Sequence, residues 1–196
     1  MLSSVKTLGS IHLTHIYGEF AMMPFNLHTL DGLSGYHRDI AMKMLDGIKH
    51  AGGIAFLTLH GRTLAAGNTL RRPGPHTDGN YEPHKSSWKT GGGGWKVGEN
   101  GPAVGTELHE RQYNTTRGGI ILASNVSACR GWVGEFDASP KVGGDCSHIQ
   151  LGEGFKLEKD QIYYGNNHFI HESIPVEFDC HRIFARITMP EDHVFS

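Results

Sequence analysis

The stretch His181-Arg182-Ile183-Phe184-Ala185-Arg186-Ile187-Thr188-Met189 decides the fold that this sequence predicts. Its residues alternate in character, as they do in a β-strand whose successive side chains point to opposite faces. The first face carries Arg182, Phe184, Arg186 and Thr188, and the second carries Ile183, Ala185, Ile187 and Met189. The purely apolar second face predicts that this strand, extended back to Cys180, packs on a core through that face.

Several short segments of similar character precede this strand, separated by Gly, Pro, Asp and Asn. We expect strands at residues 118–125, 131–136, 148–151, 161–165, 169–176 and 180–189, a buried strand at 53–59, and an early strand with a loop within 11–25. Many short strands at this spacing are typical of a β-sandwich or a jelly roll.

One helix is expected ahead of these strands. Ser34 can cap its start, and Gly52-Gly53 are expected to end it. Apolar residues recur at helical spacing, namely Tyr36, Ile40, Ala41, Met44, Leu45 and Ile48. This stripe predicts a helix that lies against a sheet.

The bulk properties fit a single domain over residues 1–196 with its core at about 53–190. Apolar residues make up 38% and charged residues 19%, and 27 glycines suit a turn-rich β protein. The formal charge of −2 gives no general attraction to nucleic acid or to an anionic membrane. No apolar run approaches the roughly 20 residues that span a bilayer. The N-terminus lacks the features of a secretion signal, so we expect a cytoplasmic protein without a membrane partner.

The cysteines Cys129, Cys146 and Cys180 do not form a disulfide framework, which also favours a reducing compartment. Residues 83–113 have no clear periodicity and include four consecutive glycines, Gly91 to Gly94. Because no Gly-Lys-Ser/Thr follows these glycines, a phosphate-binding loop is disfavoured. We expect a long loop or an inserted lid over a pocket.

His76-Thr77-Asp78 and the distant His171 form the candidate metal site. Pro73 and Pro75 favour an extended backbone, in which His76 and Asp78 point to the same face. Two imidazoles and one carboxylate are the ligand set that holds ferrous iron on one face and leaves other positions open. Taken alone, His171 is also typical of a buried, hydrogen-bonded strand histidine.

Arg182 and Arg186 lie on one face of a strand that is otherwise apolar, and they need an anionic partner. A guanidinium group binds a carboxylate through two parallel hydrogen bonds, and the hydroxyl of Thr188 can bind the same group. A surface salt bridge to Asp or Glu is the competing interpretation.

The order His76-x-Asp78, then His171, then Arg186-x-Thr188 resembles the Fe(II)/2-oxoglutarate-dependent dioxygenase superfamily, over roughly Leu70 to Pro190. The resemblance implies a mostly β, double-stranded β-helix (jelly-roll) fold with an N-terminal helix that buttresses the outer sheet. It implies that His76, Asp78 and His171 bind iron, and that Arg186 and Thr188 bind the distal carboxylate of 2-oxoglutarate. Arg182 would support the proximal carboxylate or the substrate. Asn68, Arg71 and Arg72 are positional candidates for a further contact with 2-oxoglutarate.

The implied activity uses Fe(II), 2-oxoglutarate and O2 to hydroxylate a C–H bond of a small molecule or an amino-acid side chain. One alternative is an oxygenase that acts on a modified nucleobase, for which Lys85, Lys89, Trp88 and Trp95 are candidate contacts. Another is a non-catalytic jelly-roll or cupin binding module, although the His-x-His pair typical of cupins is not found.

Overall fold

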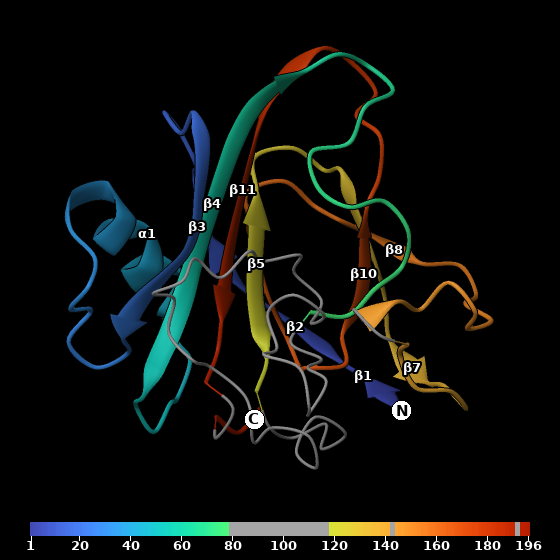
Figure 1. Cartoon of the computed structure of the whole chain (residues 1–196), viewed down its shortest axis with the longest axis horizontal. Helices are drawn as coiled ribbons and strands as arrows, with labels where there is room; N and C mark the ends of the chain where they lie inside the picture. The colour runs from blue at the N-terminus through green and yellow to red at the C-terminus, as the bar shows by residue number, and fades with distance from the viewer. Residues whose placement is uncertain (79–117, 142–143, 191–192) are drawn as a thin grey trace, which may run out of the picture.

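The computed structural model describes residues 1–78, 118–141, 144–190 and 193–196, which form antiparallel sheets and one α-helix (Figure 1). The largest sheet has six strands. In spatial order they are β2 (Val5–Ser10), β9 (Gln161–Gly165), β5 (Ile120–Ser124), β11 (Cys180–Thr188), β4 (Ile54–Leu64) and β3 (Gly18–Asn26).

A smaller sheet of three strands faces the inner side of the large sheet. Its strands, in spatial order, are β10 (Ile170–Ser173), β6 (Cys129–Trp132) and β8 (Phe155–Leu157). A separate pair joins β1 (Leu2–Ser3) to β7 (Gly134–Glu135). One buried cluster includes Leu122 and Phe184 from the large sheet together with Cys129 and Leu157 from the small one. The two sheets therefore enclose a common apolar layer.

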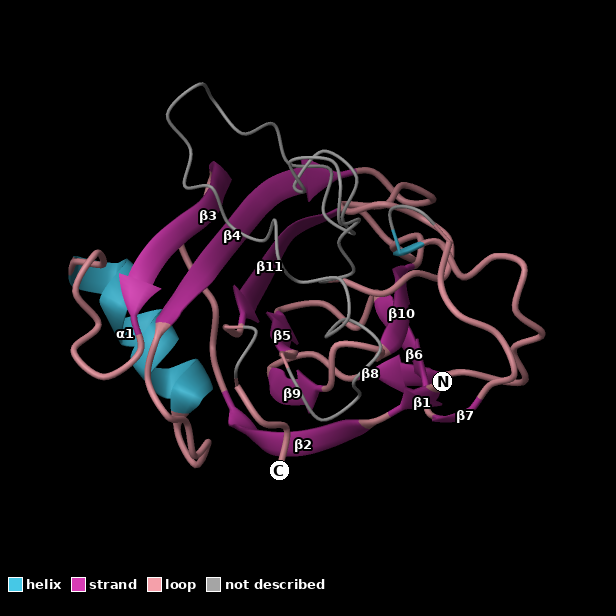
Figure 2. Cartoon of the chain, turned by 60° about the horizontal axis from the view of Figure 1, so that its bottom comes forward, coloured by secondary structure: helices cyan, strands magenta, loops and turns pink. Residues whose placement is uncertain are grey.

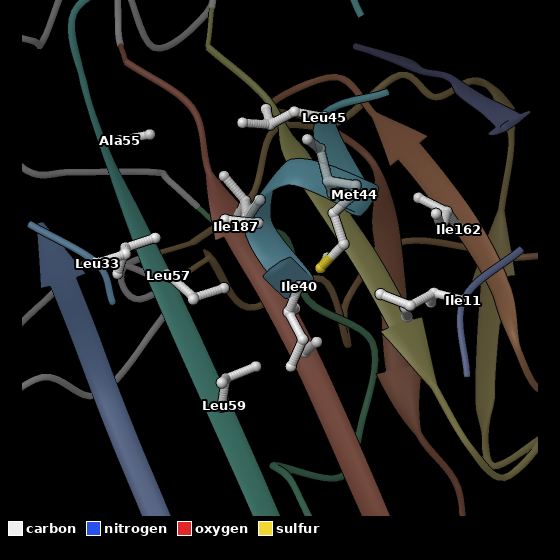
Figure 3. Packing of buried hydrophobic residues seen from close by; sticks show 14 of the residues in the cluster. Ile11, Leu33, Ile40, Met44, Leu45, Ala55, Leu57, Leu59, Ile162 and Ile187 are labelled. Atoms are coloured by element: carbon white, nitrogen blue, oxygen red, sulfur yellow. The ribbon is translucent and has the colours of Figure 1, made fainter. Parts of the chain in front are cut away.

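The helix α1 (Gly35–Leu45) covers the outer face of the large sheet, whereas β10 lies on its other side in both overall views (Figure 2). Ile40, Ala41, Met44 and Leu45 are its buried residues, as the helical spacing predicts. They share a cluster with Leu57 of β4 and Ile187 of β11 (Figure 3). The predicted buttressing helix is thus confirmed.

The central strand β11 has hydrogen-bonded neighbours on both edges, β4 and β5. Ile183, Ala185, Ile187 and Met189 all belong to the helix-side cluster, whereas Phe184 belongs to the cluster between the sheets. Arg182 and Arg186, on the same face as Phe184, are carried into the interior of the molecule. The alternation predicted for this strand is confirmed.

Several predictions of secondary structure were wrong, and the strand expected at 131–136 is divided between β6 and β7, which belong to different sheets. The helix ends at Leu45 rather than before Gly52, because Asp46 leaves the helical conformation and Gly47 takes a positive φ of 81°. Residues 148–151 are not a strand: the amide of Ile149 donates to the carbonyl of Cys146 in a local turn. Conversely, β1, β2 and β8 were not predicted, and β4 runs five residues beyond the expected end, to Leu64.

The predicted loop at residues 83–113, with its tryptophans, lysines and glycines, lies entirely within 79–117 and so outside the described residues. Within the described part of the chain, no helix is long and apolar enough to cross a membrane.

Candidate metal centre

His76 and His171 lie directly opposite each other on two paired segments. Each backbone amide donates to the other residue's carbonyl at 2.9 Å, forming an antiparallel bridge. Side chains at directly opposed positions share a face, and the two imidazole centroids are 4.6 Å apart. Backbone pairing therefore brings together two histidines that are far apart in the sequence.

A second set of backbone contacts holds the other edge of the His76 segment. The amide of Thr77 donates to the carbonyl of Gly144, and the amide of Cys146 donates to the carbonyl of Pro75, each at 2.9 Å. The segment is thus paired on both sides, between β10 and residues 144–146. The extended conformation expected from the flanking prolines agrees with this placement.

Hydrogen bonds orient both imidazoles in the same way. Nδ1 of His76 lies 2.7 Å from the carbonyl oxygen of Gly74, and Nδ1 of His171 lies 3.0 Å from that of Phe169. A carbonyl oxygen can only accept, so each Nδ1 carries the proton. The lone pair of each Nε2 is then available to a metal, as in metal sites whose histidines are fixed by outer hydrogen bonds.

Asp78 completes the group. One of its oxygens, Oδ2, lies 3.3 Å from Nε2 of His171 and also accepts a hydrogen bond from Nη1 of Arg186. One ligand atom from each of His76, Asp78 and His171 lies within 4.8 Å of the other two, and all three residues are buried. Because Nδ1 of His171 donates to a carbonyl oxygen, its Nε2 and Oδ2 of Asp78 present lone pairs to the same space, an arrangement that suits a shared metal ion.

The electrostatic environment favours the metal-binding forms of these side chains. Burial would raise the pKa of Asp78, but the charge of Arg186 and the contact with His171 outweigh it and hold that pKa well below its usual range. Burial, followed by the neighbouring His171, lowers the pKa of His76 to about 3. At neutral pH Asp78 is a carboxylate and His76 a neutral imidazole, as metal binding requires.

Arg182 is fully buried, with two neutral partners. Its Nη1 donates to Oγ of Ser173 at 2.7 Å and its Nη2 to Sγ of Cys129 at 3.0 Å. Among the described residues no carboxylate forms an ion pair with it, and its Nε has no hydrogen-bond partner. A buried guanidinium without an anion costs several kcal/mol, roughly, so this position favours a bound anion.

Arg186 and Thr188, the other residues predicted to bind a carboxylate, do not lie together at the pocket. Arg186 is buried against Asp78, as described above. Thr188 is buried near the end of β11, where it pairs with Phe56 and Ile120, and it does not line the pocket beside the metal group. The structure therefore brings Arg186, but not Thr188, to the metal group.

A pocket of about 340 Å³ opens beside the metal group. Its walls include all three candidate ligands and Arg186. The remaining lining residues are Glu19, His60, Leu70, Arg71, Arg72, Cys129, Glu172, Ser173 and Phe184. Its volume lies at the lower end of the roughly 300–1,000 Å³ typical of small-molecule sites.

Of the positional candidates, Arg71 and Arg72 line this pocket and Asn68 does not. Sequence reasoning missed Glu19 on β3 and His60 on β4. The two residues are directly paired across the sheet, so their side chains meet on one face. No motif marks either residue, and only the pairing of β3 with β4 brings them to the pocket.

Comparison of the chain with protein-family models, with curated proteins and with solved structures finds no match.

Proposed function

We propose that the protein is an Fe(II)- and 2-oxoglutarate-dependent dioxygenase that hydroxylates a C–H bond of a small molecule or an amino-acid side chain. The observation that carries this proposal is the buried group of His76, Asp78 and His171 beside a pocket. Two imidazoles and one carboxylate with open positions form the ligand set of non-haem iron oxygenases.

The side chains present fit a divalent transition metal. Both histidines offer Nε2, since their Nδ1 atoms are committed to carbonyl oxygens. The 3.3 Å between Nε2 of His171 and Oδ2 of Asp78 is near the separation of about 3 Å expected for ligands at right angles on a metal with bonds of about 2.1 Å. No side chain has to cross the pocket for all three to bind one ion.

We assign the distal carboxylate of 2-oxoglutarate to Arg182 rather than to the pair Arg186 and Thr188 suggested by the sequence resemblance. Arg182 lacks an anion among the described residues, and although it lies behind the pocket wall and does not line the pocket itself, both of its partners, Ser173 and Cys129, do. The hydroxyl of Ser173 can bind the same carboxylate. Arg186 instead orients Asp78 and keeps it ionised.

When bound, iron and 2-oxoglutarate with O2 supply the oxidising chemistry, in which 2-oxoglutarate loses carbon dioxide to become succinate and the substrate gains a hydroxyl group. The protein's part is to position these reactants and to limit water. Burial of His76, Asp78, His171 and Arg186 keeps their hydrogen bonds in a region of low dielectric, where fixed charges act most strongly.

We further propose that the two facing sheets form a double-stranded β-helix. A small sheet opposite a six-stranded sheet, with an open pocket between them and the metal ligands at β10 and its neighbour segment, supports this assignment. The pairing of a distant His76 segment with β10 is the specific contact that such a fold requires.

The size of the pocket, and not the placement of its candidate contacts, argues against the nucleobase alternative. Its candidate stacking and basic residues, Trp88, Trp95, Lys85 and Lys89, lie outside the described residues. The volume of the pocket suits a small substrate better than a base with its attached backbone. A non-catalytic module that binds a metal would use the same three residues, and the titration below separates it from an oxygenase.

An anaerobic titration with Fe(II) and then 2-oxoglutarate tests this proposal. We expect the weak visible charge-transfer band of an iron–2-oxoglutarate complex, and release of succinate once O2 is admitted. Arg182→Lys is expected to retain iron but to weaken 2-oxoglutarate about tenfold or more, because a lysine lacks the planar bidentate fork. Absence of the band in the unmodified protein would refute the proposed function.

A further inference from the structure

An ion pair on the pocket wall has no role in the mechanism proposed above. Nη1 of Arg71 donates to Oε1 of Glu19 at 3.0 Å, and both residues line the pocket that contains the metal group. The side chain of Arg71 is 19% exposed and that of Glu19 is 46% exposed, so both can be reached from the pocket.

The fold holds this ion pair in place from several sides. Glu19 pairs with His60, and His60 pairs with Phe184, in one row across β3, β4 and β11. The guanidinium of Arg71 lies over the ring of Phe184, with its central carbon 5.7 Å from the ring centroid. Because the side chains are already held in place, binding of a ligand costs less of their conformational entropy.

The ion pair also lies close to the metal group. The charges of Arg186 and Asp78 both act on Arg71, and burial, followed by Arg186, lowers the pKa of Arg71. Burial likewise lowers the pKa of His60, so this neighbour is neutral at neutral pH. Arg71 therefore lies in a partly dry part of the pocket, where a hydrogen bond from its guanidinium to a ligand carboxylate is stronger than in water.

Glu19 determines which kind of ligand fits best. A ligand with only negative charge would bind Arg71 but meet repulsion from the adjacent carboxylate of Glu19. Among the described residues Glu19 is the one hydrogen-bond partner of Arg71, which leaves further N–H groups for a ligand. A small molecule with a carboxylate beside an ammonium group complements both members of the pair.

Resting on the proposed function, we propose that the primary substrate is a free α-amino acid, whose carboxylate binds Arg71 and whose ammonium group binds Glu19. The pocket of about 340 Å³ is consistent with a substrate of this size beside the co-substrate.

The test is a binding measurement on the anaerobic complex of the protein with Fe(II) and 2-oxoglutarate. Each protein-forming L-amino acid is titrated into this complex by calorimetry, together with observation of the charge-transfer band. For any that binds, the amide (no carboxylate) and the N-acetyl derivative (no ammonium) are compared with the parent. We expect each derivative to bind about ten- to a hundredfold more weakly, the usual effect of losing a charge-assisted hydrogen bond.

Two variants then test which side chain is responsible for the weaker binding of each derivative. Arg71→Gln is expected to abolish the difference between acid and amide, and Glu19→Gln the difference between the amino acid and its N-acetyl form. Lys156→Gln is the control, since Lys156 forms an ion pair with Glu177 at 2.8 Å and neither residue lines the pocket. It should leave all three affinities unchanged.

Formation of the charge-transfer band distinguishes failure of the amino-acid assignment from failure of the proposed function. If the band forms but no amino acid binds, if the derivatives bind as tightly as their parent, or if 5-methyldeoxycytidine monophosphate binds instead, the amino-acid assignment is overturned. If no band forms, the proposed function fails and the amino-acid assignment fails with it.

Discussion

Arg186 and Asp78 form a buried ion pair at the centre of the site, and each neutralises the other's charge. Removal of one member leaves the other charged and desolvated. Under metal-free conditions we expect Arg186→Met to lower the free energy of unfolding by roughly 3–5 kcal/mol. Urea unfolding followed by fluorescence measures the change.

The double variant Arg186→Met with Asp78→Asn provides the control for this prediction. With both charges removed, we expect it to be more stable than Arg186→Met alone. A double variant whose loss equals the sum of the two single losses would show that the pair is not coupled, contrary to the structure.

At the scale of elements, the segment that carries His76 and Asp78 depends on a close approach by Gly144. Gly144 has a φ of +75°, and a Cβ placed on it would lie 2.1 Å from the carbonyl oxygen of Thr77. Gly144→Ala is expected to displace this segment and to weaken metal binding at least tenfold, because small displacements of ligands are costly. Gly152→Ala, with nothing within 4 Å of its Cβ, should bind metal normally in the same titration.

The helix α1 stabilises the large sheet without touching the pocket. Met44 is completely buried against the sheet, whereas Met42 on the same helix is 58% exposed. We expect Met44→Ala to cost roughly 2–5 kcal/mol and Met42→Ala less than about 0.5 kcal/mol. Thermal denaturation of the two variants compares them directly, and equal losses would contradict the packing described here.

The strands most accurately predicted from sequence were those with the clearest pattern. β9 lies at the predicted residues 161–165, and β11 differs from its prediction by a single residue. Both combine β-branched or aromatic residues with flanking turn residues. β2 was missed because it is mostly exposed and its two apolar residues, Val5 and Leu8, do not alternate, and β8 was missed because it has only three residues. The end of α1 was misplaced because Gly47 ends the helix before Gly52 is reached.

At the scale of the whole molecule, the pattern of candidate ligands in the sequence predicted which side chains lie together. His76, Asp78 and His171 come together as predicted, through pairing between distant segments. The alternation of β11 indicated the face on which Arg182 and Arg186 lie, but not that Arg182 is fully buried or that Arg186 contacts Asp78. How deeply a side chain is buried and which groups it contacts depend on the opposing sheet. The alternation within one strand does not specify that sheet.

The packing of the two sheets also predicts the reactivity of the thiols. Cys129 and Cys146 are buried and Cys180 is partly exposed. Burial raises the pKa of Cys146 to about 12 and also raises that of Cys129, so neither forms appreciable thiolate at neutral pH. Ellman's reagent should therefore titrate Cys180 rapidly in the native protein and all three thiols in denaturant. Rapid reaction of all three without denaturant would contradict this packing.

The central claim is that His76, Asp78 and His171 together bind one ferrous ion, and anaerobic calorimetric titration with Fe(II) tests it most directly. We predict one tightly bound ion per chain, and loss of that binding in His171→Ala while the variant remains folded. The control His148→Gln, at an exposed residue whose ring Nε2 hydrogen-bonds the carbonyl of Ser139, should bind iron as the unmodified protein does. No binding by the unmodified protein, or unchanged binding by His171→Ala, would contradict the assignment.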